Sequence, residues 1–331
     1  MFKTPSFWQS PNIIALALSP FSIIYLLIFF VIKFCTKSHA VKAKILCVGN
    51  LTVGGQGKTP CAIAIAKICD DLAIEYAFLS RGYRGKFNEE LYQVNKNDLA
   101  DKVGDEPILL SHHGSTFIAK NRYIGAKILS DSNKYQLLIF DDGLQNNSLK
   151  KDLKIVVIDE KIMFGNNLPL PAGPLREPVK SGLNNANLII YVGKKINNLP
   201  KILESKKVIF AEVEVLNFKN FIDKKIIAFC GIAYPQKFYK TLQDCNLDVI
   251  KTVDFDDHHH YSQKDLEALE QNLQQFLLTE KNAILLTTKK DWVKFPPQFQ
   301  AKISYLDIAL KFADEKLLKI EIKKILEIAN E

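Results

Sequence analysis

The pattern of hydrophobic and polar positions first marks an apolar segment near the start of the chain. Residues 13–32 carry no charged side chain and are dominated by Ile, Leu, Ala and Phe. A run of about 20 apolar residues matches the thickness of a hydrocarbon core and predicts a membrane helix. Pro20 would kink such a helix, so a helix that enters the bilayer without crossing it fits the pattern as well as a spanning one.

Basic residues flank this segment unevenly. Lys33, Lys37, Lys42 and Lys44 follow it, against only Lys3 before it. Because positive charge is retained on the cytoplasmic side of membranes, the rest of the chain is expected in the cytoplasm. A cleaved signal peptide is the alternative, but its apolar region would be unusually long and its charged start unusually weak.

Beyond the apolar segment, short apolar runs alternate with segments of helical periodicity. Residues 44–49 form the first run, and a glycine-rich turn joins it to a helical pattern over 58–71. Further runs lie at 74–80, 136–140, 154–159 and 187–193, with helical spacing at 121–130. Alternation of this kind predicts an α/β fold with a mostly parallel sheet and helices on both of its faces.

The glycine-rich turn carries the strongest chemical signal. Between a strand and a helix, glycines let successive backbone N–H groups converge on phosphates, a lysine reaches the β and γ oxygens, and a threonine hydroxyl ligates Mg²⁺. The first glycine of the common spacing G-x-x-x-x-G-K-[ST] falls on Thr52, so the turn matches a Gly-Gly-x-Gly-Lys-Thr variant. We predict a P-loop for a nucleoside triphosphate, formed by Val53, Gly54, Gly55, Gln56, Gly57, Lys58, Thr59 and Pro60.

The second half of the chain repeats the alternation without a glycine loop. Strands are predicted at 206–215, 225–229, 283–288 and 303–306, and helices at 236–245, 263–278 and 314–329. We therefore expect three parts. They are an N-terminal membrane-anchoring helix over residues 1–40, a P-loop nucleotide-binding domain over 41–205, and a smaller C-terminal α/β domain over 206–331.

Composition narrows the class of protein only in part. Hydrophobic residues make up 47% of the 331 residues and charged residues 24%, which excludes a long disordered region. The net charge of +8 suits nucleic acid, an anionic bilayer or a phosphorylated substrate equally. Six cysteines without a Cys-x-x-Cys pair predict reduced, buried thiols in a cytosolic compartment.

Acidic residues stand at two positions suited to a metal and a base. Asp141 and Asp142 end the run 136–140, from where a carboxylate can hold Mg²⁺ directly or through water. Asp105 and Glu106 begin a helical pattern, where one can accept a hydroxyl proton and the other join the metal shell. A solvated turn and a favourable helix dipole are the respective alternatives.

Three histidines, His258, His259 and His260, follow Asp256 and Asp257. Adjacent histidines cannot all point at one ion, and no Cys or His cluster elsewhere in the sequence supplies the missing ligands. A carboxylate beside a histidine instead predicts an oriented acid–base element, with an ordinary surface loop as the alternative.

Arginines in three segments are candidates for an anionic substrate, because guanidinium groups suit phosphate oxygens. Arg81 follows a strand in a segment that also holds Tyr83, Arg122 begins a helix, and Arg176 lies in a stiff proline-rich loop. Each of them alone would also fit an ordinary protein surface.

Two other functional classes compete with an enzyme of phosphoryl transfer. Residues 288–291, Thr-Lys-Lys-Asp, resemble the guanine-reading [NT]-K-x-D motif and raise a membrane-tethered GTPase switch. They follow the glycine loop by some two hundred residues, and no D-x-x-G accompanies them at Asp142. A nonenzymatic, nucleotide-gated membrane adaptor is the other alternative.

Taken together, the motifs resemble the tetraacyldisaccharide 4′-kinase family, the lipid A 4′-kinases of Gram-negative bacteria. Seven motifs follow the family's order over nearly the whole chain. They are Phe7-Trp8 before the apolar segment, residues 48–60, Ser80-Arg81-Gly82-Tyr83, Gly104-Asp105-Glu106-Pro107, residues 141–145, residues 171–177, and Phe255-Asp256-Asp257-His258-His259.

The resemblance implies a two-domain P-loop kinase at the cytoplasmic face of the bacterial inner membrane. Such a kinase uses ATP and Mg²⁺ to phosphorylate the 4′-hydroxyl of a tetraacylated glucosamine disaccharide 1-phosphate, which forms lipid IVA. It implies a lipid-linked disaccharide and the membrane surface as partners, with no nucleic acid and no obligatory protein partner.

The resemblance also implies roles for individual residues. Asp105 is similar to the catalytic carboxylate, His258 to its paired imidazole, and Asp257 to a support for that histidine. Lys58 keeps its P-loop role, and the metal site falls on Thr59, Glu106, Asp141 and Asp142.

Two positions depart from the family pattern. Gln56 stands where many members have threonine, which leaves the backbone N–H groups in place and bears only on affinity. Asn146 stands where the family usually has histidine, so no role is carried over to it.

Overall fold

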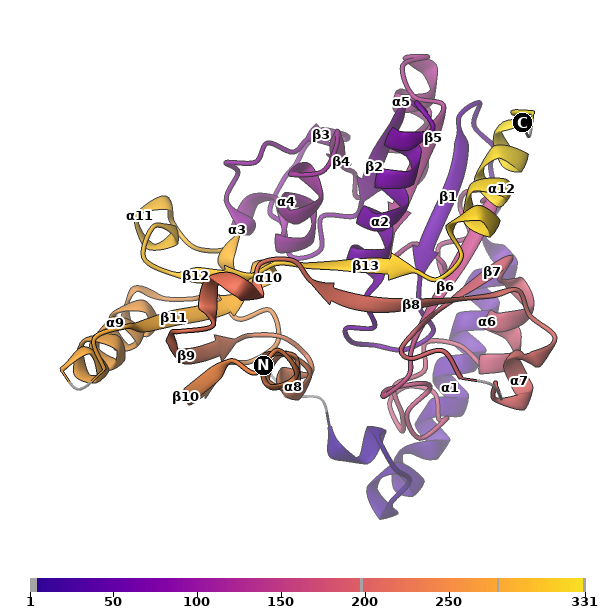
Figure 1. The fold of residues 1–331 in the computed structure, drawn as a ribbon. Coiled ribbons are helices and arrows are strands. Elements are labelled where there is room, and N and C mark those ends of the chain that lie inside the picture. Colours follow the sequence, from indigo (N-terminus) through magenta and orange to yellow (C-terminus); the bar gives the residue numbers. More distant parts are fainter. Residues whose placement is uncertain (1–4, 197–198, 279, 330–331) are drawn as a thin grey trace.

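The computed structural model describes residues 5–196, 199–278 and 280–329, which fold into two β-sheets with covering helices and one long helix beside them (Figure 1). The predicted α/β class with a large, mostly parallel sheet is confirmed. Lys3, whose charge entered the orientation argument, lies outside the described residues.

The larger sheet has nine strands in the order β13-β8-β7-β6-β1-β5-β2-β4-β3. Its inner pairs are parallel, and only the edge strands β13 and β3 run antiparallel to their neighbours. Both faces are covered, so its central strands are continuously apolar. The strands are β1 (Lys44–Gly49), β2 (Tyr76–Ser80), β3 (Tyr92–Gln93), β4 (Thr116–Ile118), β5 (Leu137–Asp141), β6 (Leu153–Asp159), β7 (Leu188–Val192), β8 (Val208–Val215) and β13 (Ile308–Phe312).

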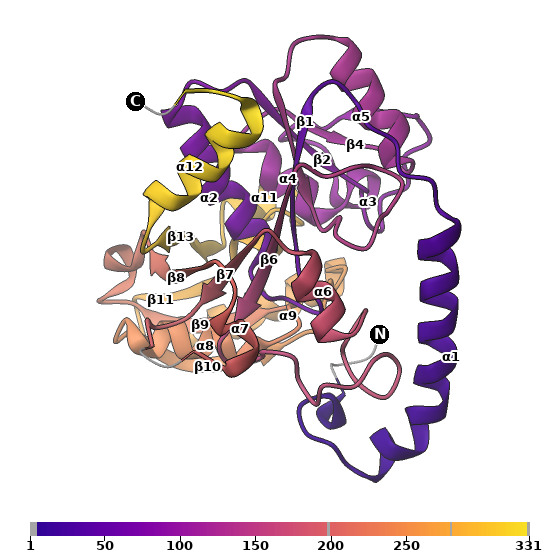
Figure 2. The ribbon, with the colours of Figure 1, turned by 90° about the vertical axis from the view of Figure 1, so that its right-hand side faces the viewer.

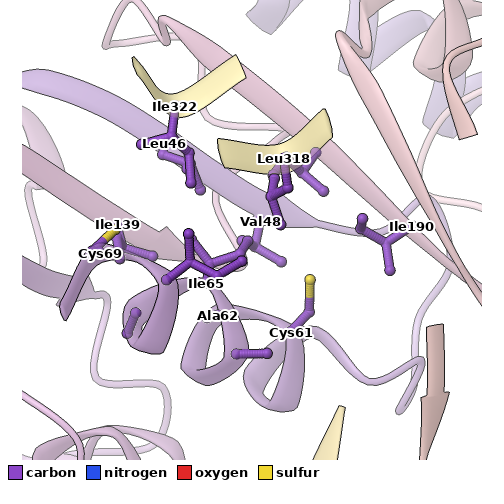
Figure 3. Packing of buried hydrophobic residues seen from close by; sticks show 14 of the residues in the cluster. Leu46, Val48, Cys61, Ala62, Ile65, Cys69, Ile139, Ile190, Leu318 and Ile322 are labelled. Carbon is purple, nitrogen blue, oxygen red and sulfur yellow. The ribbon is translucent and has the colours of Figure 1, made fainter. Parts of the chain in front are cut away.

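Alternate side chains of each central strand serve the two faces of this sheet. On one face Leu46 and Val48 of β1 pack with Ile65 of α2 and with Leu318 and Ile322 of α12 (Figure 3). The other face is covered by α5, α6 and α7. The helices around this sheet are α2 (Lys58–Asp71), α3 (Ala100–Val103), α4 (Asp105–Ser111), α5 (Arg122–Asp131), α6 (Val179–Asn185), α7 (Lys201–Glu204) and α12 (Glu315–Leu326).

The smaller sheet has four parallel strands in the order β10-β9-β11-β12. Apolar side chains of α8 cover one face and those of α9 the other. The smaller unit comprises β9 (Lys225–Cys230), β10 (Asp248–Asp254), β11 (Ala283–Thr288), β12 (Ser304–Leu306), α8 (Pro235–Asp244), α9 (Gln263–Leu277), α10 (Lys289–Trp292) and α11 (Pro297–Gln300).

Sheet membership does not follow the expected boundary at residue 205. The strands β8 and β13 both lie in the larger sheet, although their residues fall in the range 206–331. Helix α12 also packs on the larger sheet, through Leu318 and Ile322. The chain therefore leaves the larger sheet along β8, builds the smaller one, and returns along β13 (Figure 1).

Helix α1 (Ile13–Cys35) stands along the side of the larger sheet (Figure 2). At about 1.5 Å per residue its 23 residues suffice to cross a hydrocarbon core. Among the described residues it is the one helix long and apolar enough to do so. Pro20 lies inside the helix without ending it, and much of the apolar surface is exposed, Phe34 to 93%.

All six cysteines are free thiols, as expected for a reducing compartment. Four are buried, but Cys35 at the end of α1 is exposed and Cys245 is half-buried. The expectation of burial therefore fails for these two; Cys35 ends α1, much of whose apolar surface is exposed.

Candidate active site

The predicted P-loop lies between β1, which ends at Gly49, and α2, which begins at Lys58. Gly54 and Gly57 have φ values of 108° and 87°, in a region that residues with a Cβ seldom adopt. The turn thus depends on glycine at these positions. The whole segment 53–60 lines a cavity of about 1020 Å³.

Gln56 braces the P-loop from inside the protein. Its side-chain amide donates to Thr52 Oγ1 at 2.6 Å and to the carbonyl of Met163 at 2.8 Å. Its Oε1 accepts from the backbone N–H of Asp159 at 3.2 Å. The residue that departs from the family pattern therefore ties the turn to the carboxyl end of β6, a role that threonine is too short to fill in the same way.

Asp142 is surrounded by positive charge. Arg176 donates from an NH1 group to Asp142 Oδ1 at 2.7 Å, and Lys58 Nζ lies 3.7 Å from Oδ2. The buried Arg122 donates to the backbone carbonyl of Asp142 at 2.6 Å. Burial alone would raise the pKa of Asp142, but Lys58 and Arg176 outweigh burial and hold this pKa well below its usual range.

Asp141, the neighbouring residue at the end of β5, has different surroundings. Its Oδ2 accepts from Thr59 Oγ1 at 2.7 Å, whereas its buried Oδ1 has no hydrogen-bond partner in the described structure. Burial, and next the negative charge of Glu106, raise the pKa of Asp141 to about 7 against the opposing charge of Lys58.

Oxygens of Asp141 and Thr59 fit a magnesium ion at the P-loop. Mg²⁺ in phosphoryl-transfer sites is held by one or two protein oxygens, with nucleotide and water oxygens completing its shell. In the described part of the chain no three His, Cys, Asp or Glu side chains form a metal-sized group. Asp141 Oδ1 and Thr59 Oγ1 can supply these protein oxygens, whereas both oxygens of Asp142 already face cations.

Asp105 and His258 meet although they come from different sheets. Asp105 begins α4 beside the larger sheet, and His258 follows β10 of the smaller one. Asp105 Oδ2 lies 2.8 Å from His258 Nδ1, and both side chains are largely buried. Burial would raise the pKa of Asp105, but Lys290 and His258 hold it below its usual range.

The backbone of His258 is held as firmly as its ring. Its φ is 56°, its N–H donates to the carbonyl of Gly231 at 3.1 Å, and its carbonyl accepts from Arg84 at 3.0 Å. Tyr83 meets the imidazole edge to face at 5.8 Å between ring centroids. A nonglycine residue held in this region is typical of functional sites.

Asp257, predicted as a support for His258, does not form a hydrogen bond with its imidazole. Its Oδ1 lies 4.0 Å from His258 Nε2 and has no hydrogen-bond partner in the described structure. The nearer group to Nε2 is Lys290 Nζ, at 3.3 Å.

The predicted substrate-binding side chains divide into two groups. Arg81 and Tyr83 are exposed and line the cavity. Arg122 and Arg176 also line it, but both guanidinium groups are engaged at Asp142.

The Thr-Lys-Lys-Asp segment does not offer a guanine-reading carboxylate. Asp291 is fully buried, and its Oδ2 accepts from the N–H of Gly231 at 3.0 Å and from Thr288 Oγ1 at 2.8 Å. Lys294 pairs with its other oxygen at 2.8 Å. A carboxylate saturated in this way has a structural role, and the GTPase interpretation loses its motif.

Two lysines contact the site although the sequence did not predict them as site residues. Lys290 Nζ lies 3.9 Å from Asp105 Oδ2 and 3.6 Å from Glu106 Oε1, and Lys294 Nζ lies 3.8 Å from Asp105 Oδ2. The sequence indicated Lys290 only as part of the Thr-Lys-Lys-Asp segment that resembles a guanine-reading motif. Contact across 185 residues leaves no signal in a single sequence.

A single cavity brings these groups together. Its wall includes the P-loop, Asp141, Arg81, His258 and Lys290. A glycine loop at the carboxyl end of a parallel sheet, a carboxylate on the adjacent strand and an aspartate–histidine pair on the same cavity define a P-loop phosphotransferase. The chain belongs to the tetraacyldisaccharide-1-P 4′-kinase family, whose sequence model matches residues 14–327.

Relatives and a solved structure agree with this assignment. The tetraacyldisaccharide 4′-kinase of Rickettsia typhi is 37% identical over 97% of this chain and 98% of its own. That of Paramagnetospirillum magneticum is 32% identical over 96% of both chains. The crystal structure of the "apo" form of LpxK from Aquifex aeolicus in complex with ATP covers 95% of this chain and 100% of its own, with a TM-score of 0.77 and 26% identity.

Proposed function

We propose that this protein transfers the γ-phosphate of ATP to the 4′-hydroxyl of a tetraacyldisaccharide 1-phosphate, which forms lipid IVA in lipid A biosynthesis. The observation that carries the proposal is the shared cavity, whose wall holds both the P-loop and His258, the partner of Asp105. The relatives named as tetraacyldisaccharide 4′-kinases and the ATP complex of a family member support this choice of donor and acceptor.

The P-loop and its surroundings neutralise the triphosphate. Lys58 releases Asp142 to reach phosphate oxygens, while the backbone N–H groups of the turn bind them. Thr59 and Asp141 would hold Mg²⁺, which supplies positive charge to the β and γ oxygens when bound. Phosphoryl transfer needs little covalent help, so positioning and charge account for most of the rate enhancement.

The acceptor hydroxyl still has a proton to lose. We assign its acceptance to the Asp105–His258 pair, since a carboxylate bonded to an imidazole is a suitable general base. Help of this kind contributes about 10²–10⁴ in rate. Tyr83 lies against the ring of His258, and Arg81 is exposed on the wall of the same cavity; both would contact the sugar phosphate.

The substrate's acyl chains place the reaction at a membrane. Exposing each CH₂ group to water costs about 0.8 kcal/mol, so the kinase must work where the chains are embedded. Helix α1 supplies an apolar surface for this purpose. The lysines that follow it favour the cytoplasmic face of the bacterial inner membrane.

Labelled ATP tests the assignment directly. The full chain in mixed micelles, given γ-labelled ATP, Mg²⁺ and the tetraacyl disaccharide 1-phosphate, should place the label on the 4′ position of the product sugar. Asp105→Ala should lose most turnover while it still binds ATP. Nucleotide turnover that is indifferent to the lipid, or tight GTP binding with ATP excluded, would contradict the proposal.

A further inference from the structure

Helix α10 carries two adjacent lysines with different surroundings. Lys289 points to Asp307, which lies between β12 and β13, with Nζ 3.0 Å from Oδ1. Lys290 points the other way, into the space between α4 and the loop that carries His258. Of these two lysines, only Lys290 meets the groups assigned above to proton transfer.

The ammonium group of Lys290 contacts three side chains at once. It lies 3.3 Å from His258 Nε2, 3.6 Å from Glu106 Oε1 and 3.9 Å from Asp105 Oδ2. Asp105 and Glu106 belong to the larger unit, whereas His258 and Lys290 belong to the smaller one. Without this cation, Asp105 and Glu106 would both lose a positive charge that they now face.

The same segment also fixes the backbone of the histidine. Asp291 accepts the N–H of Gly231, and the carbonyl of Gly231 accepts the N–H of His258. Residues 288–291 thus hold His258 through its main chain and, by way of Lys290, at the ring nitrogen that Asp105 leaves open.

We propose that Lys290 is a positioning residue for phosphoryl transfer, which holds the ring of His258 against Asp105 across the junction of the two sheets. A hydrogen bond from Lys290 to Nε2 leaves the ring proton on Nδ1, where it faces Asp105 Oδ2 at 2.8 Å. This inference rests on the proposed kinase activity. It gives the Thr-Lys-Lys-Asp segment a role in the site without any contact to a nucleotide base.

The test compares Lys290→Ala with the wild type under the labelled-ATP assay. We expect kcat to fall on the order of 10–100-fold, the range of a weakened general base, with the Kd for ATP within about twofold of the wild type. Lys290→Arg, which keeps the charge and a donor, should recover part of the loss. Lys264→Ala, at an exposed lysine of α9 outside the cavity wall, is the control and should stay within about twofold in kcat.

A double-mutant cycle separates positioning from charge balance alone. If Lys290 acts through the imidazole, adding Lys290→Ala to His258→Ala should lower kcat by no more than about twofold further. Lys290→Met provides a second variant that fills the same space, and rates are normalised to ATP bound per chain so that unfolded protein is not counted.

Three results would overturn the inference. They are a normal kcat in Lys290→Met, an undiminished penalty in the His258→Ala background, and a parallel loss of ATP binding. If the wild type itself fails to phosphorylate the disaccharide, the proposed function fails instead, which distinguishes the two outcomes.

Discussion

Asp141 and Asp142 are adjacent in sequence, yet their pKa values are shifted in opposite directions. The main chain of β5 turns between them, so Asp141 faces Thr59 and Glu106, while Asp142 faces Lys58 and Arg176. Burial and the charge of Glu106 therefore outweigh Lys58 and raise the pKa of Asp141, whereas Lys58 and Arg176 outweigh burial and lower the pKa of Asp142. The pair was predicted as one metal site, and in the structure its two members have different surroundings.

The raised pKa of Asp141 predicts a pH-dependent stability in metal-free buffer. The folded protein binds the proton of this carboxyl more tightly than the unfolded chain does, because its pKa is about 7 when folded. The protonated carboxyl therefore contributes to stability fully below about pH 4, and this contribution is lost as the pH rises through 7. Asp141→Asn should remove this loss. Urea unfolding with EDTA at pH 5.5 and pH 8 measures it, and an equal pH effect in both proteins would contradict the prediction.

Lys58→Ala should remove most of the activity, because Lys58 supplies positive charge to the β and γ phosphates and also pairs with Asp142 at 3.7 Å. Initial rates and ATP binding together report the effect. The exposed Lys127 of α5 provides a control, since Lys127→Ala removes the same charge away from the cavity. Normal turnover in Lys58→Ala would refute the P-loop assignment.

At the scale of elements, helix α1 is bound to the loop that carries Arg176. Ser22 Oγ donates to the carbonyl of Pro169 at 2.9 Å, and Tyr25 donates to the carbonyl of Arg176 at 2.9 Å. Lys33 lies 3.9 Å from Glu177. Because Arg176 in turn holds Asp142, helix α1 contributes to the position of a group beside the P-loop.

Tyr25→Phe should separate this contribution from anchoring. Loss of one hydrogen bond of about 0.5–1.5 kcal/mol at the loop should lower kcat roughly 2–10-fold and leave membrane recovery unchanged. Deletion of residues 1–34 should instead impair membrane recovery more than nucleotide binding. Sedimentation with vesicles and ATP titration measure the two effects, and an equal loss of both in the deletion would indicate misfolding.

Sequence periodicity recovered the elements with strong local signals. The bounds of β1, α2 and β11 agree with the prediction to the residue. It missed β4, which is three residues long, and β10 and β13, whose edge positions expose polar residues and weaken the pattern. The P-loop and the Asp105–His258 pair were predicted, whereas the contacts of Lys290 depend on how two sheets meet, which periodicity does not encode.

At the scale of the whole molecule, the smaller sheet closes on the P-loop through helix α8. Lys237 Nζ lies 2.7 Å from Asp159 Oδ2 at the end of β6 and 3.4 Å from the carbonyl of Gly55. The ring of Tyr234 lies against Gly54, where an added Cβ would meet it at 3.2 Å. The two sheets are therefore in contact at the glycine turn as well as at the Asp105–His258 pair.

Lys237→Ala should loosen this contact. We expect the KM for ATP to rise about 3–10-fold with a small change in kcat, since the variant leaves the groups that react in place. Lys240→Ala, one turn further along the same helix, removes an exposed pair with Asp244 and is the matched control. Equal KM values for the two variants would show that the contact has no bearing on the nucleotide.

The origin of Asp105 and His258 in different units has a consequence for the proton acceptor. The two side chains meet at 2.8 Å because the two units are in contact, so the acceptor is complete only while that junction is intact. A change that parts the units would leave the glycine turn whole and yet disable proton transfer.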